Sequence, residues 1–256
     1  MIFPIRDENP QINIPYITYL FIGLNLLAWV GLQGMGAEPA LSQSVCQFGL
    51  IPADLTSQEL VRSRPFCNID GNPDWYSLVT SIFMHGSWMH LIGNMWFLWI
   101  FGNNVEDSMG SGRFAIFYIL TGLAASATQI IADTGSVVPM VGASGAIGGV
   151  MGAYIVLYPK VHVHMFFLFR TFSIPAVFML GYWIVTQLMG GFSSMGTVGG
   201  GVAFWAHVGG FISGMVLIYI FKDKELLENH PYHGWNQTEH QEKVWQKVPT
   251  RTVGWH

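Results

Sequence analysis

The chain has 256 residues, of which 51% are hydrophobic and only 10% are charged, and its mean hydropathy is +0.40. Soluble domains carry a charge on about a quarter of their residues, so this composition excludes an ordinary soluble enzyme, a disordered chain and a nucleic-acid binder with a basic face. The net charge of −4 favours no class of partner, and 30 glycines with ten tryptophans suit helices packed closely in lipid. We predict an all-α polytopic membrane protein.

Charged residues mark the ends of the apolar segments, because a charge in mid-bilayer is costly and a crossing helix needs about 20 apolar residues. The last charge-free segment, 171–221, is too long for one crossing. Gly190-Gly191 and Gly199-Gly200-Gly201 divide it into two. We therefore predict six spans, at about residues 15–32, 86–105, 114–132, 144–159, 171–189 and 202–221.

The lysines and arginines between the spans predict the orientation, because cytoplasmic loops carry an excess of them. With the N-terminus inside, only Arg62 and Arg64 lie outside. We therefore expect both termini in the cytoplasm, a membrane domain over 1–221 and a short polar tail over 222–256. The first ten residues lack the features of a removable signal peptide. The shortness of the chain favours the inner (plasma) membrane of a bacterium over the membrane of an organelle.

A long exterior segment, 33–74, joins the first two spans. It mixes apolar stretches with prolines, and loops of this length usually have a function or fold into short helices of their own. We expect part of it to lie in the outer leaflet. Cys46 and Cys67 both lie in it, and the sequence leaves open whether they form a disulfide.

Polar residues within the spans are the candidates for function, because lipid excludes such residues unless they have a role. His85, His90 and Asn94 lie at the start of the second span, Ser144 opens the fourth and His207 lies early in the sixth. These three spans all run from outside to inside. We therefore expect the five residues to lie at a similar depth, close to the outer surface.

This set of residues suits acyl transfer. A serine hydroxyl becomes a nucleophile when a base takes its proton, and histidine is the usual base. The tetrahedral oxyanion then needs hydrogen-bond donors, which His90, Asn94 and the N–H groups at a helix start can supply. The predicted spans hold no Asp or Glu, so we expect a dyad of Ser144 and His207 with slow turnover.

Each of these features also has a purely structural interpretation. Gly145 with Gly149, and Gly210 with Gly214, are pairs of small residues four apart, which favour close helix packing. A serine at a helix start is more often a cap than a nucleophile, and a histidine in a span is as often a hydrogen-bond partner between helices. Both interpretations are compatible, since the glycines would bring the serine and histidine helices together.

The sequence resembles the rhomboid family of intramembrane serine proteases through motifs in spans two, four and six, in the family's order. The resemblance covers about residues 75–221, and the segment 105–118 between spans two and three also contributes to it. The three main motifs are His85-x4-His90-x3-Asn94, Gly142-Ala143-Ser144-Gly145 and Ala206-His207-Val208-Gly209-Gly210-Phe211-x2-Gly214.

The resemblance implies a six-helix rhomboid-like bundle whose first exterior loop is partly embedded in the membrane. It implies Ser144 as nucleophile and His207 as general base. His90, Asn94 and the backbone N–H of Ser144 would bind the oxyanion. The supporting residues would be His85, Gly142 and Gly145, with Glu106 and Arg113 tying helix ends together, and the fifth span would admit substrate.

The sequence departs from the family pattern at two places. Some members have an aromatic residue four positions after the nucleophile, stacked on the histidine, where this chain has Gly148. We expect Phe204, Trp205 or Tyr154 to orient His207 instead, if any residue does. The tryptophan–arginine pair often found in the first loop is Trp75-Tyr76 here.

The leading hypothesis is an intramembrane serine endopeptidase that acts on transmembrane segments of other proteins. The alternative is an inactive rhomboid-like protein with a binding or quality-control role. A channel would need a polar path through the inner halves of the spans, which are apolar. We expect no cofactor, metal or nucleic acid, with membrane lipid and membrane-protein substrates as partners. The sequence does not indicate the oligomeric state.

Overall fold

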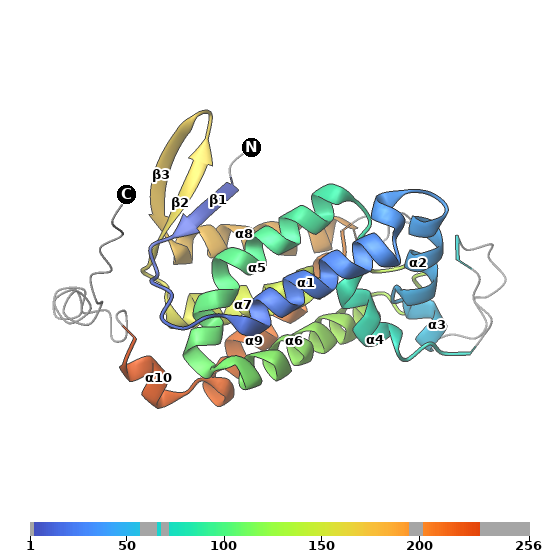
Figure 1. Ribbon diagram of the computed structural model, residues 1–256. Helices are drawn as coiled ribbons and strands as arrows, with labels where there is room; N and C mark the ends of the chain where they lie inside the picture. The colour runs from blue at the N-terminus through green and yellow to red at the C-terminus, as the bar shows by residue number, and fades with distance from the viewer. Residues whose placement is uncertain (1–2, 57–65, 68–71, 195–201, 231–256) are drawn as a thin grey trace, which may run out of the picture.

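The computed structural model describes residues 3–56, 66–67, 72–194 and 202–230, and most of them are helical. Long helices run side by side, and a small sheet projects from one end of the bundle (Figure 1). The long helices are α1 (Tyr16–Gly31), α5 (Trp88–Met109), α6 (Ser111–Ala132), α7 (Ser144–Leu157), α8 (Ala176–Ser194) and α9 (Phe204–Phe221).

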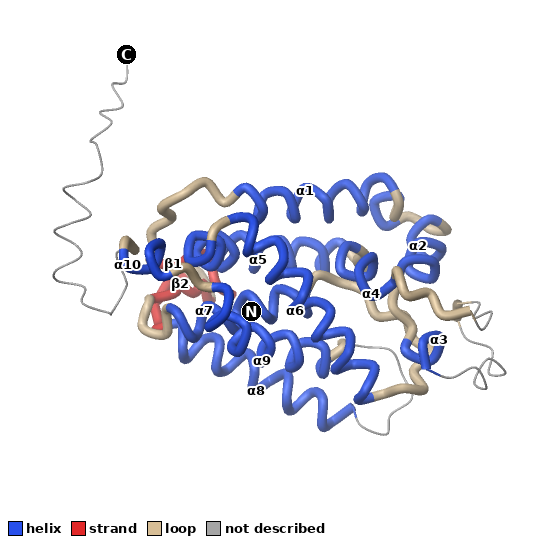
Figure 2. The backbone as a smooth tube through the Cα atoms, turned by 90° about the horizontal axis from the view of Figure 1, so that it is seen from below, coloured by secondary structure: helices blue, strands red, loops and turns tan. Residues whose placement is uncertain are grey.

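Three helices of the described residues are long and apolar enough to cross a membrane, namely α6, α8 and α9. Helices α1 and α7 are apolar but shorter, with 16 and 14 residues. Helix α5 has 22 residues but carries polar side chains near both ends. In Figure 2, α1 and α8 lie on opposite sides of the bundle, with the other long helices between them.

The prediction of an all-α fold was wrong at one end of the molecule. Strands β1 (Phe3–Asp7), β2 (His162–Phe167) and β3 (Arg170–Pro175) form an antiparallel sheet in the order β1-β2-β3. The fifth span was predicted to begin at 171, but the chain stays extended to Pro175 and α8 begins at Ala176. A count of apolar residues does not distinguish strand from helix, whereas the alternating burial along β2 is the period of a strand.

The long segment after α1 folds into short helices at the opposite end of the bundle from the sheet. They are α2 (Ala40–Phe48), α3 (Pro52–Thr56) and, just before α5, α4 (Ser77–Thr80). A disulfide joins Cys46 to Cys67, which settles the question that the sequence left open. Leu50 pairs with Met140, so this segment is bonded to the loop that leads into α7.

At the sheet end, Glu106 on α5 holds the start of α1. Its carboxylate accepts hydrogen bonds from the backbone N–H of Ile17 and of Thr18, from the Thr18 hydroxyl and from Ser111 Oγ, at 2.5 to 3.0 Å. These bonds satisfy first-turn N–H groups that have no acceptor within their own helix. Glu106 therefore ties α1 and α6 to α5, as the sequence predicted.

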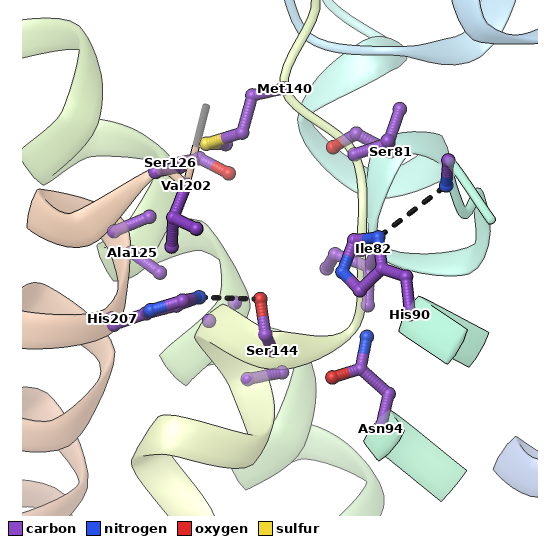
Figure 3. Close-up of a pocket in the computed structure, with 18 of the residues that line it drawn as sticks. Ser81, Ile82, His90, Asn94, Ala125, Ser126, Met140, Ser144, Val202 and His207 are labelled. Carbon is purple, nitrogen blue, oxygen red and sulfur yellow. Dashed lines mark hydrogen bonds between the residues drawn. The ribbon is translucent and has the colours of Figure 1, made fainter. Parts of the chain in front are cut away.

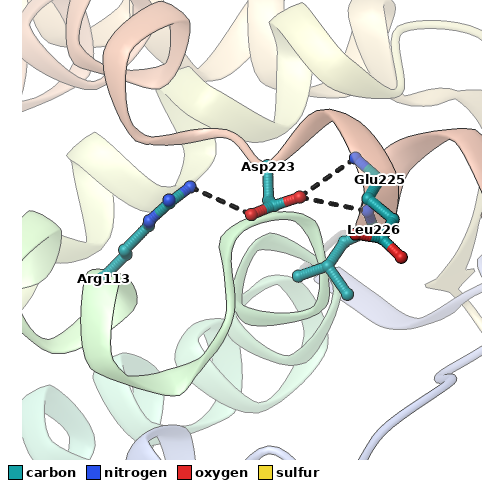
Figure 4. Close-up of polar contacts among 4 residues, drawn as sticks. All are labelled: Arg113, Asp223, Glu225 and Leu226. Carbon is teal, nitrogen blue, oxygen red and sulfur yellow. Dashed lines mark hydrogen bonds and ion pairs between the residues drawn. The ribbon is translucent and has the colours of Figure 1, made fainter.

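The chain after α9 also packs on the bundle. Arg113 on α6 pairs with Asp223 at 3.2 Å, and Asp223 accepts from the N–H groups of Glu225 and Leu226 to cap α10 (Lys224–Glu228) (Figure 4). Leu227 is buried. Arg113 therefore joins helix ends as predicted, and the predicted polar tail begins with a packed helix; residues 231–256 of that tail lie outside the described residues.

Helices α7 and α9 meet backbone to backbone. A Cβ atom at Gly210 would lie 2.0 Å from the carbonyl oxygen of Gly145, and one at Gly214 would lie 1.9 Å from that of Gly149. No side chain fits in such a space. The glycine pairs singled out in the sequence therefore form this contact, which we call the α7–α9 contact.

A side chain in the α7–α9 contact should separate the two helices. We expect Gly214→Val to lower the free energy of unfolding by about 1–3 kcal/mol, the usual cost of overpacking, and the melting temperature by several degrees. Gly23→Val on α1 is the matched control, because a Cβ atom at Gly23 has no atom within 4 Å. Thermal unfolding of the purified proteins measures both, and equal melting temperatures would contradict the close contact.

The sheet end should respond to pH through Asp7 of β1. Burial is the main cause that raises the pKa of this carboxyl to about 7, although Tyr154 Oη donates a hydrogen bond to it at 2.5 Å. Between pH 4 and 7 the folded protein therefore holds a proton that the unfolded chain has lost. We expect stability to fall as pH rises through this range and the slope to shrink in Asp7→Asn, measured by thermal unfolding at pH 5 and 8; Asp133→Asn, at an exposed carboxyl, should keep the slope.

Candidate active site

Ser144 and His207 form a hydrogen-bonded pair across the α7–α9 contact. Ser144 is the first residue of α7, His207 lies in the first turn of α9, and Ser144 Oγ is 2.7 Å from His207 Nε2 (Figure 3). Gly145 and Gly210 follow these residues in their helices and form the nearest part of the contact. The close approach of the two backbones therefore sets the distance between hydroxyl and imidazole.

His90 and Asn94 face this pair from α5. They lie one turn apart on the same side of the helix, as the spacing of four predicted. Gly142, just before α7, lies against both: a Cβ atom there would be 2.6 Å from His90 Nε2 and 3.5 Å from Asn94 Nδ2. Its φ of +126° is rare for a residue with a side chain. The loop before Ser144 can therefore approach α5 only with glycine at 142.

A cavity of about 470 Å³ lies between α5, α6, α7 and α9. Six of the seven residues that the sequence singled out line it, namely His90, Asn94, Gly142, Ser144, Gly145 and His207. Ser126 of α6, which the sequence did not single out, also lines it. The cavity is large enough for several water molecules, so the hydroxyl and the imidazole face a space that water can fill.

His85 is the seventh residue, and it lies behind the cavity. It is fully buried, its Nε2 lies 2.9 Å from Asn94 Nδ2, and its backbone is held by the Gln33 side chain through bonds of 2.7 and 2.8 Å. Because it bonds to Asn94, His85 fixes that amide. Its contact with the cavity wall is therefore indirect, through Asn94.

The residue beside the second nitrogen of His207 was not predicted. Gln187 on α8 places its Oε1 2.7 Å from His207 Nδ1, and the Trp183 ring lies 5.7 Å from the imidazole. The suggestion of Phe204, Trp205 or Tyr154 was wrong: Phe204 packs on Gly190, Trp205 on Phe192, and Tyr154 bonds to Asp7. Gln187 was detectable, because it is a polar residue within a predicted span.

The packing around Gly148 explains why no aromatic residue lies four positions after Ser144. A Cβ atom at 148 would lie 3.1 Å from the His207 carbonyl oxygen and 3.7 Å from the Trp183 ring. The space that an aromatic residue of α7 would fill is taken by the α9 backbone and by Trp183 from α8. Two residues of α8 therefore flank the imidazole.

The chemistry available at the site is that of neutral groups. Among the described residues, no three His, Cys, Asp or Glu side chains gather as a metal site. The cavity wall offers three serine hydroxyls, two imidazoles, an amide and the N–H groups at the start of α7. Such a set can activate a hydroxyl and donate hydrogen bonds to an anion that forms beside it.

Comparison with known proteins identifies the family. The model of the Rhomboid domain matches residues 72–224, more than half of the chain and all of the residues around the cavity. The chain belongs to the rhomboid family. Rhomboid domains are polytopic, so this is an integral membrane protein, in accord with the apolar helices.

Several rhomboid proteins are similar to this chain at about 30% identity. Rhomboid-like protein 11, chloroplastic, of Arabidopsis thaliana is 31% identical over 58% of this chain and 53% of its own length. Rhomboid protease GluP of Bacillus subtilis is 31% identical over 78% of this chain and 34% of its own length, and Rhomboid protein 1, mitochondrial, of Saccharomyces cerevisiae is 29% identical over 55% and 40%. The chain thus spans between a third and about half of these relatives.

A methyl group at position 142 should disturb the α5 side of the site. We expect Gly142→Ala to push the His90 ring away and to slow the labelling of Ser144 by a fluorophosphonate at least about tenfold, the effect of about 1.4 kcal/mol on a barrier. Gly112→Ala on α6 is the control, because a Cβ atom there has no atom within 4 Å. Equal labelling rates in the two variants would contradict the role given to the tight loop.

Proposed function

We propose that this protein is an intramembrane serine endopeptidase that cleaves transmembrane segments of other membrane proteins. The observation that carries the proposal is the 2.7 Å contact between Ser144 Oγ and His207 Nε2 beside a cavity. Ser144 is the nucleophile and His207 the general base. Membership of the rhomboid family, which includes Rhomboid protease GluP, supports the proposal.

The first half of the reaction forms an acyl-enzyme. Ser144 Oγ bonds to the carbonyl carbon of the scissile peptide while its proton passes to His207 Nε2. The tetrahedral intermediate then collapses, the C–N bond breaks, and the proton on Nε2 passes to the departing amine. The N-terminal part of the substrate stays as an ester on Ser144.

The second half uses a water molecule from the cavity. Water adds to the ester carbon and gives a proton to Nε2, and the C–Oγ bond then breaks as Oγ takes that proton back. The products are a carboxylic acid and the free enzyme. In both halves the oxyanion forms beside Ser144, where His90, Asn94 and the N–H groups at the start of α7 are the donors; the N-terminal end of the helix dipole adds to them.

The length of α7 supports a site below the membrane surface. Its 14 residues rise about 21 Å, whereas the hydrocarbon core is about 30 Å thick. If the sheet end of α7 lies at the cytoplasmic interface, Ser144 lies within the outer part of the hydrocarbon core. We accordingly propose six spans with both termini in the cytoplasm of a bacterium, and membrane proteins as substrates.

Substitution of the two catalytic residues tests the proposal. We expect Ser144→Ala and His207→Ala each to lower cleavage of a model transmembrane substrate in proteoliposomes by at least about 10³-fold, because nucleophile and base act as a unit. Fluorophosphonate labelling should be confined to Ser144 and lost in His207→Ala.

Ser213→Ala and His162→Ala are the controls. The Ser213 hydroxyl bonds to the Gly210 carbonyl of its own helix, and His162 lies in β2 at the far end of the bundle. Both variants should cleave at the wild-type rate. Cleavage that survives in Ser144→Ala would refute the proposal, and a wild-type protein that neither cleaves nor labels would favour the inactive rhomboid-like alternative.

A further inference from the structure

The dyad leaves one atom of the proposed base unaccounted for, the Nδ1 nitrogen of His207. A neutral imidazole carries its proton on one nitrogen only, and the base works only if Nε2 has the free lone pair. Ser144 does not enforce this, because a hydroxyl can donate or accept. The group at Nδ1 must therefore select the tautomer.

That group is the side-chain amide of Gln187, whose orientation follows from its other contacts. The Thr186 hydroxyl donates to the carbonyl oxygen of Trp183 at 2.6 Å, so its oxygen is left to accept. The amide nitrogen of Gln187 donates to this Thr186 oxygen at 3.2 Å, and to the Trp183 carbonyl oxygen at 3.4 Å. The amide oxygen of Gln187 therefore faces His207 Nδ1 at 2.7 Å.

An amide oxygen accepts hydrogen bonds and cannot donate them. The proton of neutral His207 consequently lies on Nδ1, and the lone pair of Nε2 points at Ser144 Oγ–H. Resting on the proposed function, we propose that Gln187 is a positioning residue that holds the general base in its working tautomer and orientation. In the Ser-His-Asp triad a carboxylate accepts the hydrogen bond from Nδ1 of the histidine, whereas here a side-chain amide does so.

A neutral amide suits this site because α8 is one of the helices able to cross a membrane. An ionised carboxylate in such a helix is costly to remove from water, whereas an amide whose hydrogen bonds are satisfied costs far less. When Nε2 takes the serine proton, the imidazolium holds a proton on both nitrogens. The Nδ1 proton stays bonded to Gln187 Oε1, and the amide dipole stabilises the new charge.

Gln187→Leu is the first test, because leucine has a similar size and cannot accept a hydrogen bond. We expect kcat to fall at least about tenfold with KM within about twofold, since the lost bond acts on the base and not on substrate binding. In Gln187→Glu the acceptor returns. Its carboxylate also stabilises the imidazolium, so cleavage should recover at high pH while the acidic limb of the pH–rate profile moves up by about one pH unit.

Gln129→Leu is the matched control. Gln129 also presents an amide oxygen to α9, but it accepts from the backbone N–H of Ala206 at 3.2 Å and not from the imidazole. Its loss should lower the melting temperature and leave the pH–rate profile in place. If Gln187→Leu likewise lowers only the melting temperature and leaves the pH–rate profile in place, Gln187 has a merely structural role and the proposal is overturned.

A second measurement does not depend on turnover. Nitrogen-15 NMR of protein labelled at histidine, with His207 assigned from the His207→Ala spectrum, reports which ring nitrogen carries the proton. We expect Nδ1–H in wild type and in Gln129→Leu, and Nε2–H or a mixture in Gln187→Leu. If the wild-type protein reacts with a fluorophosphonate at Ser144 but holds the His207 proton on Nε2, only the role of Gln187 is refuted. If Ser144 of the wild-type protein never reacts with the fluorophosphonate, the proposed function is refuted.

Discussion

The contact between the backbones of α7 and α9 is the constraint on which the rest of the structure depends. The short side chain of Ser144 reaches the imidazole of His207 only if α7 and α9 come closer than ordinary side chains permit. Gly210 and Gly214 allow that approach, because the carbonyl oxygens of Gly145 and Gly149 lie where their Cβ atoms would be. The 2.7 Å distance between Ser144 and His207 is therefore a property of the backbone and not of flexible side chains.

The polar side chains at the two ends of the bundle differ in kind and in how they are paired. At the sheet end, charged groups are paired or bonded to many donors, as Glu106 is to the starts of α1 and α6 and Arg113 is to Asp223. Around the cavity, the polar side chains that lie on the wall are hydroxyls, imidazoles and an amide. Helix ends are thus held by charge, whereas no Asp, Glu, Lys or Arg is among the described residues that line the cavity.

Much of the site was predictable because polar residues are rare in membrane-spanning segments. Ser144, His207, His90 and Asn94 stood out as polar residues in apolar segments, and the alternation of spans predicted their common depth; the structure places all four around one cavity, and their catalytic roles stay a prediction. Gln187 met the same criterion and was overlooked, because only the packing of α8 on α9 places it beside His207. Composition also could not reveal strand β3 or the Cys46–Cys67 bond, which depend on contacts between distant segments.

The position of Gln187 makes the imidazole dependent on a third helix. Ser144 and His207 belong to α7 and α9, which the glycines hold together, whereas Gln187 belongs to α8 on the outside of the bundle. A shift of α8 by about 1 Å away from α9 would lengthen the Nδ1–Oε1 separation beyond hydrogen-bonding range, while the distance between Ser144 and His207 stayed the same. The contact at Nδ1 therefore depends on the distance between α8 and α9, whereas the contact at Nε2 depends on the distance between α7 and α9.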